Sequence, residues 1–381
     1  MKVTKVETLR ADRYNWVKVH TDEGIHGTGE THPASGTAGW PKAVLGGVEY
    51  CADYLVGKNP LEIEKHWQHM FRRQLFRGGS DLMSAMSAID QALWDIASKA
   101  AGLPVYRMLG GPVRDRVKVY VHLRGQTPEE MADDARKRIA EGYKALRFYP
   151  FASLEGGMPE SYQAMVRMAV SFMKAVREAA GPDMDIMIDV VNRLTPPEAI
   201  AIGRALAEYG LYFFEDPIEP DNIDAMADVA RAMPVPVATG ERLYTIYQFQ
   251  ELLKKKAAAY IRPDPSLAGG ISQIKKIAGL AEAEYVGVVP HNPLSPVSTA
   301  VCAQLCACIH NIAVQEYTGT EWQKPKRDFV VEPLKIKDGF LEIPDRPGLG
   351  IELNEEALKH YPPRPIERPI AYNLDGSLRD Y

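Results

Sequence analysis

A regular alternation of two patterns dominates the sequence from residue 116 onward. Short apolar runs typical of buried strands alternate with amphipathic helical stretches such as "PEEMADDARKRIAEG" and "PPEAIAIGRALAEYG". The predicted strands lie near 117–121, 144–148, 184–189, 211–215, 235–239, 258–262, 286–290 and 312–316. Strands that alternate with helices favour a parallel sheet, and eight of them favour closure into a barrel. Because the helix pattern after residue 316 is weak, we predict a modified TIM barrel of the type (β/α)7β.

The residues on either side of this segment predict a second, α+β module. Residues 1–30 alternate between polar and apolar positions around a "DEG" turn, which is typical of an antiparallel hairpin. Residues 40–110 have helical spacing, as in "LMSAMSAIDQALWDIASKAAG". The tail contains one more short strand, a turn and a Pro- and Gly-rich segment. We therefore expect a capping domain from 1–115, a catalytic barrel from 116–322, and a C-terminal segment, 323–381, that returns to the capping domain.

Composition argues against several classes of function. The net charge is −5, with acids and bases mixed along the chain, so no basic face for nucleic acid or a membrane surface is expected. No apolar run is long enough to span a bilayer, and "MKVTKVETLRADRYNW" lacks the apolar core of a secretory signal. These features favour a cytoplasmic protein that acts on a small molecule.

The cysteines allow two interpretations. Three of the four lie in "VCAQLCACIH", close to His310, which is compatible with a metal site. The surrounding Ala, Leu, Val and Ile instead favour a buried helix in which cysteine packs as a small apolar residue. We expect the buried helix and no disulfide framework, which suits a reducing compartment.

Acidic residues follow the predicted strands at a constant interval. Asp189 lies near the end of "MDIMIDV", Glu215 follows the apolar part of "YFFEDP", and Glu241 lies near the end of "PVATGER". The two intervals between these acids are 26 residues each. Since one βα unit separates neighbours on a barrel rim, the three side chains should converge. Three carboxylates in a partly dry cavity repel one another unless a cation lies between them, and an all-oxygen set suits Mg²⁺. Asp216 can support this site or cap a helix.

The series continues around the rim with Asp264, His291 and Glu316. A carboxylate that accepts one imidazole N–H raises the basicity of the other nitrogen, so Asp264 and His291 predict a general base. The alternative for His291 is a histidine satisfied by backbone at a strand end. A metal and a base together can remove the weakly acidic proton next to a carboxylate, because the metal stabilises the charge of the enediolate. A hydroxyl on the adjacent carbon can then leave.

These residues resemble the enolase superfamily, its mandelate racemase subgroup, and within it the galactonate-dehydratase-like acid-sugar dehydratases. The resemblance covers nearly the whole chain and is carried by "GGSDLMSAMSAIDQALWDIASKAAGLPVYRMLGG", "FFEDP", "ATGER", "RPDPSLAGGISQIKKIA", "PHNPLSPVSTA", "VQEY" and "PDRPGLGIELNEEAL". It implies Mg²⁺ bound by Asp189, Glu215 and Glu241, a His291–Asp264 dyad, and Glu316 on the substrate-carboxylate side. It also implies a homo-oligomer, often an octamer, and a capping domain that contacts the far end of the substrate. Candidates for that contact are Trp16, which could equally be a core residue, and "FRGGS" at 76–80.

Two departures from the resemblance affect the expected reaction. The subgroup often has a KxK motif at the end of the second strand, but here "LRFYPF" places Arg147 and Tyr149 there. Arginine does not readily release a proton, which weighs against two-base racemisation. Arg147 is better suited to hold a carboxylate or hydroxyl, and Tyr149 can donate a proton; the alternative is a packing pair.

The second departure follows the first metal ligand. Galactonate dehydratases resembling this chain have a histidine two residues after the first metal ligand, where it serves as the acid for the leaving hydroxyl. This sequence has Val191 at that position. Asn192 and Arg193 are candidate substrate contacts, but neither replaces that acid. His291 can serve both steps if the proton and the hydroxyl leave from one face.

We therefore expect a Mg²⁺-dependent dehydratase that converts a sugar acid to its 2-keto-3-deoxy product. The alternative is an epimerase or a cycloisomerase of a sugar-acid lactone or anhydro acid, through the same intermediate. A non-catalytic binding barrel and a metallohydrolase are further possibilities, but the metal triad and dyad argue against the first. The all-carboxylate triad argues against a zinc hydrolase.

Overall fold

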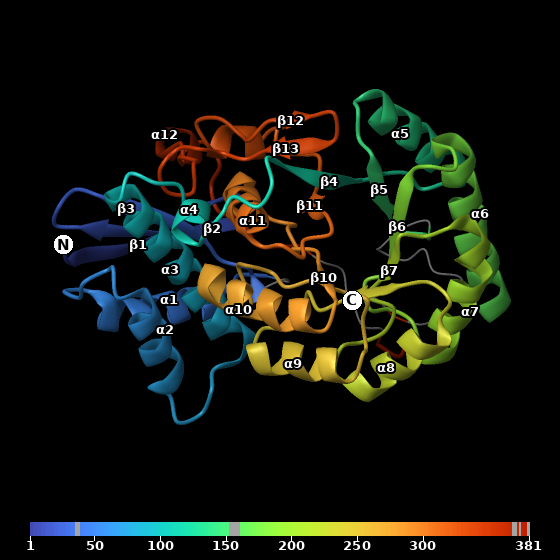
Figure 1. Cartoon of the computed structure of the whole chain (residues 1–381), viewed down its shortest axis with the longest axis horizontal. Helices are drawn as coiled ribbons and strands as arrows, with labels where there is room; N and C mark the ends of the chain where they lie inside the picture. The colour runs from blue at the N-terminus through green and yellow to red at the C-terminus, as the bar shows by residue number, and fades with distance from the viewer. Residues whose placement is uncertain (35–38, 152–160, 368–371, 373–374, 379–381) are drawn as a thin grey trace.

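The computed structural model describes residues 1–34, 39–151, 161–367, 372 and 375–378. Figure 1 shows the N-terminal elements, in blue, on one side of the molecule and helices of the barrel along the opposite side. The structure confirms the prediction of an α/β barrel with an N-terminal capping domain. Among the described residues, no helix combines the length and apolar character needed to cross a membrane.

The capping domain consists of an antiparallel three-stranded sheet covered by helices. Its strands are β1 (Val3–Ala11), β2 (Tyr14–Thr21) and β3 (His26–Glu30), and its helices are α1 (Lys42–Leu55), α2 (Ile63–Arg72), α3 (Gly79–Ala100) and α4 (Val105–Met108). Helix α3 lies directly on β3. A Cβ atom on Gly27 or Gly29 would fall 2.0 or 1.9 Å from the carbonyl oxygens of Ala92 and Ala88. Only glycine permits so close an approach between strand and helix.

The barrel is formed by eight parallel strands in the described part of the chain. They are β4 (Arg116–His122), β5 (Ala145–Phe148), β6 (Asp185–Asp189), β7 (Phe213–Glu215), β8 (Val237–Thr239), β9 (Tyr260–Ile261), β10 (Gly287–Val288) and β11 (Gln315–Tyr317). The strands pair in chain order from β4 to β10, and β11 pairs with β4. Val288 of β10 exchanges hydrogen bonds with Asn311 and Ala313, just before β11, which closes the ring.

Helices between the strands cover the outside of the barrel. They are α5 (Pro128–Ala140), α6 (Tyr162–Ala180), α7 (Pro196–Leu206), α8 (Ile223–Ala232), α9 (Ile246–Lys254), α10 (Gly270–Ala283) and α11 (Pro296–Cys308), with a short helix η2 (Ala207–Tyr209) after α7. Several begin with a capping side chain: Thr127, Asn222 and Thr245 each accept a backbone N–H three residues ahead. These caps fix the residues at which the loops before α5, α8 and α9 end.

The barrel interior is packed rather than hollow. Alternate strand residues point inward and form one apolar cluster: Tyr120, Ala145, Met187, Phe213, Ala238, Val289 and Val314. Since these side chains fill the middle of the barrel, polar groups at the carboxyl ends of the strands are directed to the rim. The cysteine-containing segment is the buried helix α11, and Cys302, Cys306 and Cys308 are buried there with free thiols.

The C-terminal segment, predicted to return to the capping domain, contacts the barrel as well as the capping domain. Strands β12 (Ile336–Lys337) and β13 (Phe340–Glu342) form a hairpin, and β13 pairs antiparallel with β4 of the barrel. Further on, the backbone N–H of Leu349 donates to Asp95 of α3, and Arg364 forms an ion pair with Asp12 in the β1–β2 turn. The remaining elements are η3 (Lys326–Phe329) and α12 (Glu355–Leu358). The C-terminal segment thus contacts both the capping domain and the barrel. The predicted domain boundaries at residues 115 and 322 stay predictions.

Candidate active site

Acidic side chains meet at the carboxyl ends of β6 and β7. Asp189 and Glu215 are the last residues of these strands and are paired in register, and Asp216 follows directly. Carboxylate oxygens of the three residues all lie within 4.8 Å of one another. Glu215 Oε2 and Asp216 Oδ2 are buried and have no hydrogen-bond partner among the described residues. Unsatisfied carboxylate oxygens in so small a volume fit a bound cation.

Burial and mutual repulsion make these carboxylates unfavourable as a bare cluster. Burial raises the pKa of Asp216 well above its usual range, and the carboxylates of Glu241 and Glu215 add to this effect. Burial also raises the pKa of Glu215, although the cations Arg262 and Arg147 oppose the shift. A bound cation would supply the positive charge that such a cluster requires.

Glu241, the third predicted ligand, lies two residues beyond β8 and faces the same cavity. Its Oε2 is 3.3 Å from His291 Nε2 and 3.9 Å from Arg262 Nη2. The compact acidic cluster therefore contains Asp216 in the place where the sequence predicts Glu241. Asp216 is already engaged, because its Oδ1 accepts a hydrogen bond from Thr239 Oγ1 at 2.5 Å. Asp189, Glu215 and either of these residues could hold a metal.

Two arginines neutralise this region. Arg147, at the end of β5, forms an ion pair with Asp189 and lies 3.5 Å from Glu215 Oε1. Arg262 is fully buried, and its Nε and Nη2 lie 2.7 Å from Glu215 Oε1 and Glu316 Oε2, respectively. Its Nη1 also donates to the hydroxyl of Tyr120 at 2.7 Å. Arg262 is thus the central cation between the acidic groups of the rim.

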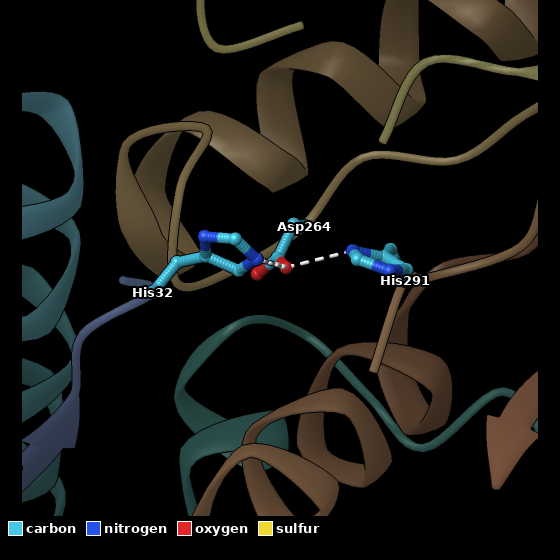
Figure 2. Close-up of side chains that lie close together, drawn as sticks. All are labelled: His32, Asp264 and His291. Atoms are coloured by element: carbon cyan, nitrogen blue, oxygen red, sulfur yellow. Dashed lines mark hydrogen bonds and ion pairs between the residues drawn. The ribbon is translucent and has the colours of Figure 1, made fainter. Parts of the chain in front are cut away.

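The predicted dyad is present in the structure. His291 Nδ1 lies 2.8 Å from Asp264 Oδ2, and the carboxylate is fully buried (Figure 2). Asp264 Oδ1 accepts from the backbone N–H of Ser266 at 2.6 Å, so the carboxylate is held in place. Burial alone would lower the pKa of His291, but the carboxylates of Glu241 and Asp264 raise it to about 9. With Nδ1 bound to Asp264, Nε2 is the nitrogen that would exchange a proton with a substrate, and a cation bound by Glu241, whose Oε2 lies 3.3 Å away, would favour its unprotonated form.

Glu316 lies in β11 at the same rim, and both its oxygens are occupied. Oε1 contacts His122 Nε2 at 2.8 Å, while Oε2 accepts from Arg262 and from the backbone N–H of Asn292 at 2.8 Å. Burial opposes ionisation, but Arg262 and His122 hold the pKa of Glu316 well below its usual range. Burial and Arg147 lower the pKa of His122 to about 4, so His122 is a neutral donor to Glu316.

These groups surround one cavity of about 700 Å³ between the barrel rim and the capping domain. Arg13, Tyr14, His32 and Ser80 line it from the capping domain. The barrel contributes predicted site residues to the wall: Arg147, Asp189, Asn192, Glu241, His291 and Glu316. The volume suits a small, polar ligand. Ser80 is the residue of the "FRGGS" segment that reaches this wall.

Some predicted site residues lie elsewhere. Trp16 is fully buried in the core, where it packs edge-on against Phe329 and donates its indole N–H to Ser295 Oγ at 3.0 Å. Substrate contact is therefore not expected of Trp16, because it is a core residue. The hydroxyl of Tyr149 accepts a hydrogen bond from Arg193 Nη1 at 3.2 Å, and neither residue lines the cavity.

The turn after β6 has a strained backbone. Val191 and Asn192 have φ angles of 54° and 60°, a region that β-branched residues rarely adopt. In this conformation the backbone N–H of Val191 donates to Asp189 Oδ1 at 2.7 Å. Val191 thus orients a candidate metal ligand through its backbone, although its side chain cannot serve as an acid. Asn192 donates to the carbonyl of Ile218, and its Oδ1 is buried without a partner among the described residues.

Three site residues were not predicted from the sequence. His122 and Arg262 stand at barrel strand ends, in "RVKVYVH" and "YIRPDPS", so extending the strand-end rule to basic residues would have found them. His32 follows β3 in the capping domain, and its Nε2 lies 4.0 Å from Asp264 Oδ2. No pattern within the first 40 residues indicates that this histidine meets the barrel.

Comparison with known proteins gives a consistent assignment. Residues 2–110 match the mandelate racemase/muconate lactonizing enzyme N-terminal domain, and residues 130–357 match the enolase C-terminal domain-like family. The chain is 36% identical over 389 aligned residues to D-galactonate dehydratases of Variovorax paradoxus and Xanthomonas campestris pv. campestris, with complete coverage of both chains in each case.

Comparison with solved structures agrees with this family assignment. A galactarate dehydratase candidate from Agrobacterium radiobacter, bound to Na and L-malate, superposes with a TM-score of 0.91 at 33% identity over the whole of both chains. A dehydratase candidate from Mesorhizobium loti gives 0.89 at 34% identity, covering 95% of this chain and 98% of the other. The fold and rim chemistry define an enzyme of the enolase superfamily. Within it, the chain belongs to the mandelate racemase/muconate lactonizing enzyme family.

Proposed function

We propose that this protein is a Mg²⁺-dependent hydro-lyase that removes water from a sugar acid to give the 2-keto-3-deoxy acid. The observation that carries the proposal is the His291–Asp264 pair, 2.8 Å apart, at the same rim as the Asp189, Glu215 and Asp216 carboxylate cluster, with His291 and Asp189 lining one cavity. The similarity to D-galactonate dehydratases over the full length supports a sugar acid as substrate. A two-base epimerase is less favoured because Arg147 stands where the second base would be. A cycloisomerase is less favoured because the full-length relatives are dehydratases.

Asp189, Glu215 and Glu241 are our proposed ligands of the metal. Glu241 is preferred to Asp216 because it faces the cavity, whereas Asp216 is tied to Thr239. A divalent ion bound there would withdraw charge from the substrate carboxylate and so increase the acidity of the neighbouring C–H. Mg²⁺ is proposed from the all-oxygen ligand set.

The chain's own residues then perform the proton chemistry. His291 Nε2 removes the proton from the carbon next to the carboxylate, and Asp264 stabilises the resulting imidazolium through Nδ1. Arg147, on the cavity wall, is placed to bind the substrate carboxylate or a hydroxyl. Glu316 and Arg262 hold each other and His122 in fixed positions at the rim. Tyr149 stays a weaker candidate for proton donation because it faces Arg193.

A substrate screen tests this function directly. The purified protein with MgCl₂ is incubated with C5 and C6 aldonic and aldaric acids, beginning with D-galactonate and galactarate, and 2-keto acid is measured. A dehydratase gives 2-keto acid from at least one of them. Exchange of the α-proton in D₂O without 2-keto acid would favour the isomerase. A homo-oligomer and a cytoplasmic location are retained as predictions.

A further inference from the structure

His32 is a second imidazole beside the dyad, and the capping domain supplies it (Figure 2). Its backbone N–H donates to the carbonyl of Ser266 in the barrel at 3.2 Å, and its own carbonyl accepts from Ser84 Oγ of α3 at 2.7 Å. The rings of His32 and His291 are 6.2 Å apart, and both residues line the cavity. His32 is therefore held firmly where the two domains meet the substrate.

The hydrogen bonds of His32 define its tautomer. The backbone N–H of Ala34 donates to His32 Nδ1 at 3.0 Å. A ring nitrogen that accepts an N–H carries no proton of its own, so the proton of this imidazole lies on Nε2. Nε2 is also the nitrogen that lies 4.0 Å from Asp264 Oδ2. His32 thus directs an N–H group toward the dyad.

This tautomer can donate a hydrogen bond but is poorly suited to transfer a proton. Loss of the Nε2 proton would leave a strongly basic imidazolate. Protonation at Nδ1 would instead remove the acceptor that Ala34 uses. The separation of 4.0 Å from Asp264 is too long for a direct hydrogen bond. His32 itself lines the cavity, whereas the carboxylate of Asp264 is fully buried behind it.

We propose that His32 binds the hydroxyl that leaves from the sugar acid and holds it on the face of the substrate that meets His291. The inference rests on the dehydration proposed above and adds a specificity-determining residue to it. It also accounts for Val191. With the leaving hydroxyl held on the face of His291, that residue can act first as the base and then as the acid, so no acid is needed at position 191.

His291 Nε2 takes the proton from C2, and the C–H electron pair passes into the enediolate. The bond from C3 to oxygen then breaks, its electron pair leaves with the oxygen, and the proton on His291 passes to that oxygen to form water. His32 stays neutral throughout and stabilises the departing oxygen. The resulting enol takes a proton from solvent at C3 and releases the proton of its C2 hydroxyl to solvent, which gives the 2-keto-3-deoxy acid.

Two substitutions of His32 separate this role from a structural one. His32→Asn retains a group near Nδ1 that can accept from Ala34 but removes the donor at Nε2. His32→Gln places an amide N–H₂ close to the former position of Nε2. For each variant, formation of 2-keto acid is compared with exchange of the α-proton in D₂O, using the best sugar acid from the screen.

We expect His32→Asn to lower kcat for dehydration about 100-fold, as loss of one such donor does elsewhere, while exchange falls no more than about threefold. His32→Gln should recover dehydration to within about tenfold of wild type and keep the wild-type pH profile of kcat. Equal loss of exchange and dehydration in His32→Asn, or no loss of either, would overturn the inference. Loss of the high-pH limb of the kcat profile in His32→Gln would also overturn the inference. Such a loss would mean that His32 is the acid that donates the proton. If the wild-type protein forms no 2-keto acid from any sugar acid, the proposed function itself fails.

Discussion

Arg147 forms an ion pair with Asp189, the carboxylate that ends the neighbouring strand. The guanidinium therefore lies against an expected metal ligand, where its positive charge opposes a divalent ion. We predict that Arg147→Gln binds Mg²⁺ about tenfold more tightly than wild type, which corresponds to about 1.4 kcal/mol, but turns over substrate more slowly. Isothermal titration calorimetry measures the first effect. Arg13→Gln, on the capping-domain side of the same cavity, is the control and should leave Mg²⁺ affinity unchanged. Equal or weaker Mg²⁺ binding by Arg147→Gln would contradict this electrostatic account.

The proposed metal ligands can be distinguished from their neighbour Asp216. Glu215→Gln and Glu241→Gln each remove a charge that faces the ion, so each should weaken Mg²⁺ binding by at least about tenfold. Asp216→Asn keeps an acceptor for Thr239 and should have a smaller effect, because Oδ1 of Asp216 is already bound to the Thr239 hydroxyl. The three variants are compared by titration with Mg²⁺. A larger loss for Asp216→Asn than for Glu241→Gln would show that Asp216 is the third ligand.

The general base is tested by isotope exchange. His291→Asn removes the acceptor nitrogen, so α-proton exchange and dehydration should both fall about 1,000-fold or more. Mg²⁺ binding should persist, since His291 is not a proposed ligand. Proton NMR in D₂O follows exchange directly. If exchange stays near the wild-type rate, another residue must remove the proton.

The rim acids and the dyad were predictable because barrel geometry places one strand end every βα unit. Asp189, Glu215, Asp264 and His291 recur at that interval, and the structure brings them to one rim. Asp216 was underestimated, because the turn that brings its oxygen near the others depends on a φ of 43°, which no spacing rule reveals. His32 was missed for a different reason: it reaches the dyad only through packing of the cap on the barrel. Trp16 could not be assigned from sequence, because an aromatic residue near a loop looks the same whether it faces a cavity or the core; the structure places it in the core.

Arg262 should be important for stability as well as for the site. Its guanidinium is fully buried between Glu215 and Glu316. Replacement by Met would leave these acids without their main cation, which typically costs about 3–5 kcal/mol. Chemical denaturation measures the loss. Arg231→Met is the control, because its ion pair with Asp228 is exposed, and a change below about 1 kcal/mol is expected there. A similar small change for Arg262→Met would refute the assigned role.

Asp90 should make the stability of the folded protein depend on pH. Its carboxylate lies in α3 and accepts from the backbone N–H and the hydroxyl of Ser272 in α10, and burial raises its pKa to about 7. The folded protein then retains a proton that the unfolded chain releases near pH 4. The resulting stabilisation is complete below that pH and is lost as pH rises to about 7.

Asp90→Asn is neutral at every pH, so its free energy of unfolding relative to wild type should rise from pH 5 to pH 8. Loss of one hydrogen bond to Ser272 adds a constant offset of about 1 kcal/mol in the opposite direction. Denaturation series at several pH values measure the difference. Asp345→Asn provides the control, because hydrogen bonds from Tyr106 and Arg107 lower the pKa of that exposed carboxylate. The free energy of unfolding of Asp345→Asn relative to wild type should therefore stay constant from pH 5 to pH 8. A flat difference for Asp90→Asn as well would mean that Ser272 stabilises the ionised carboxylate enough to cancel the effect of burial.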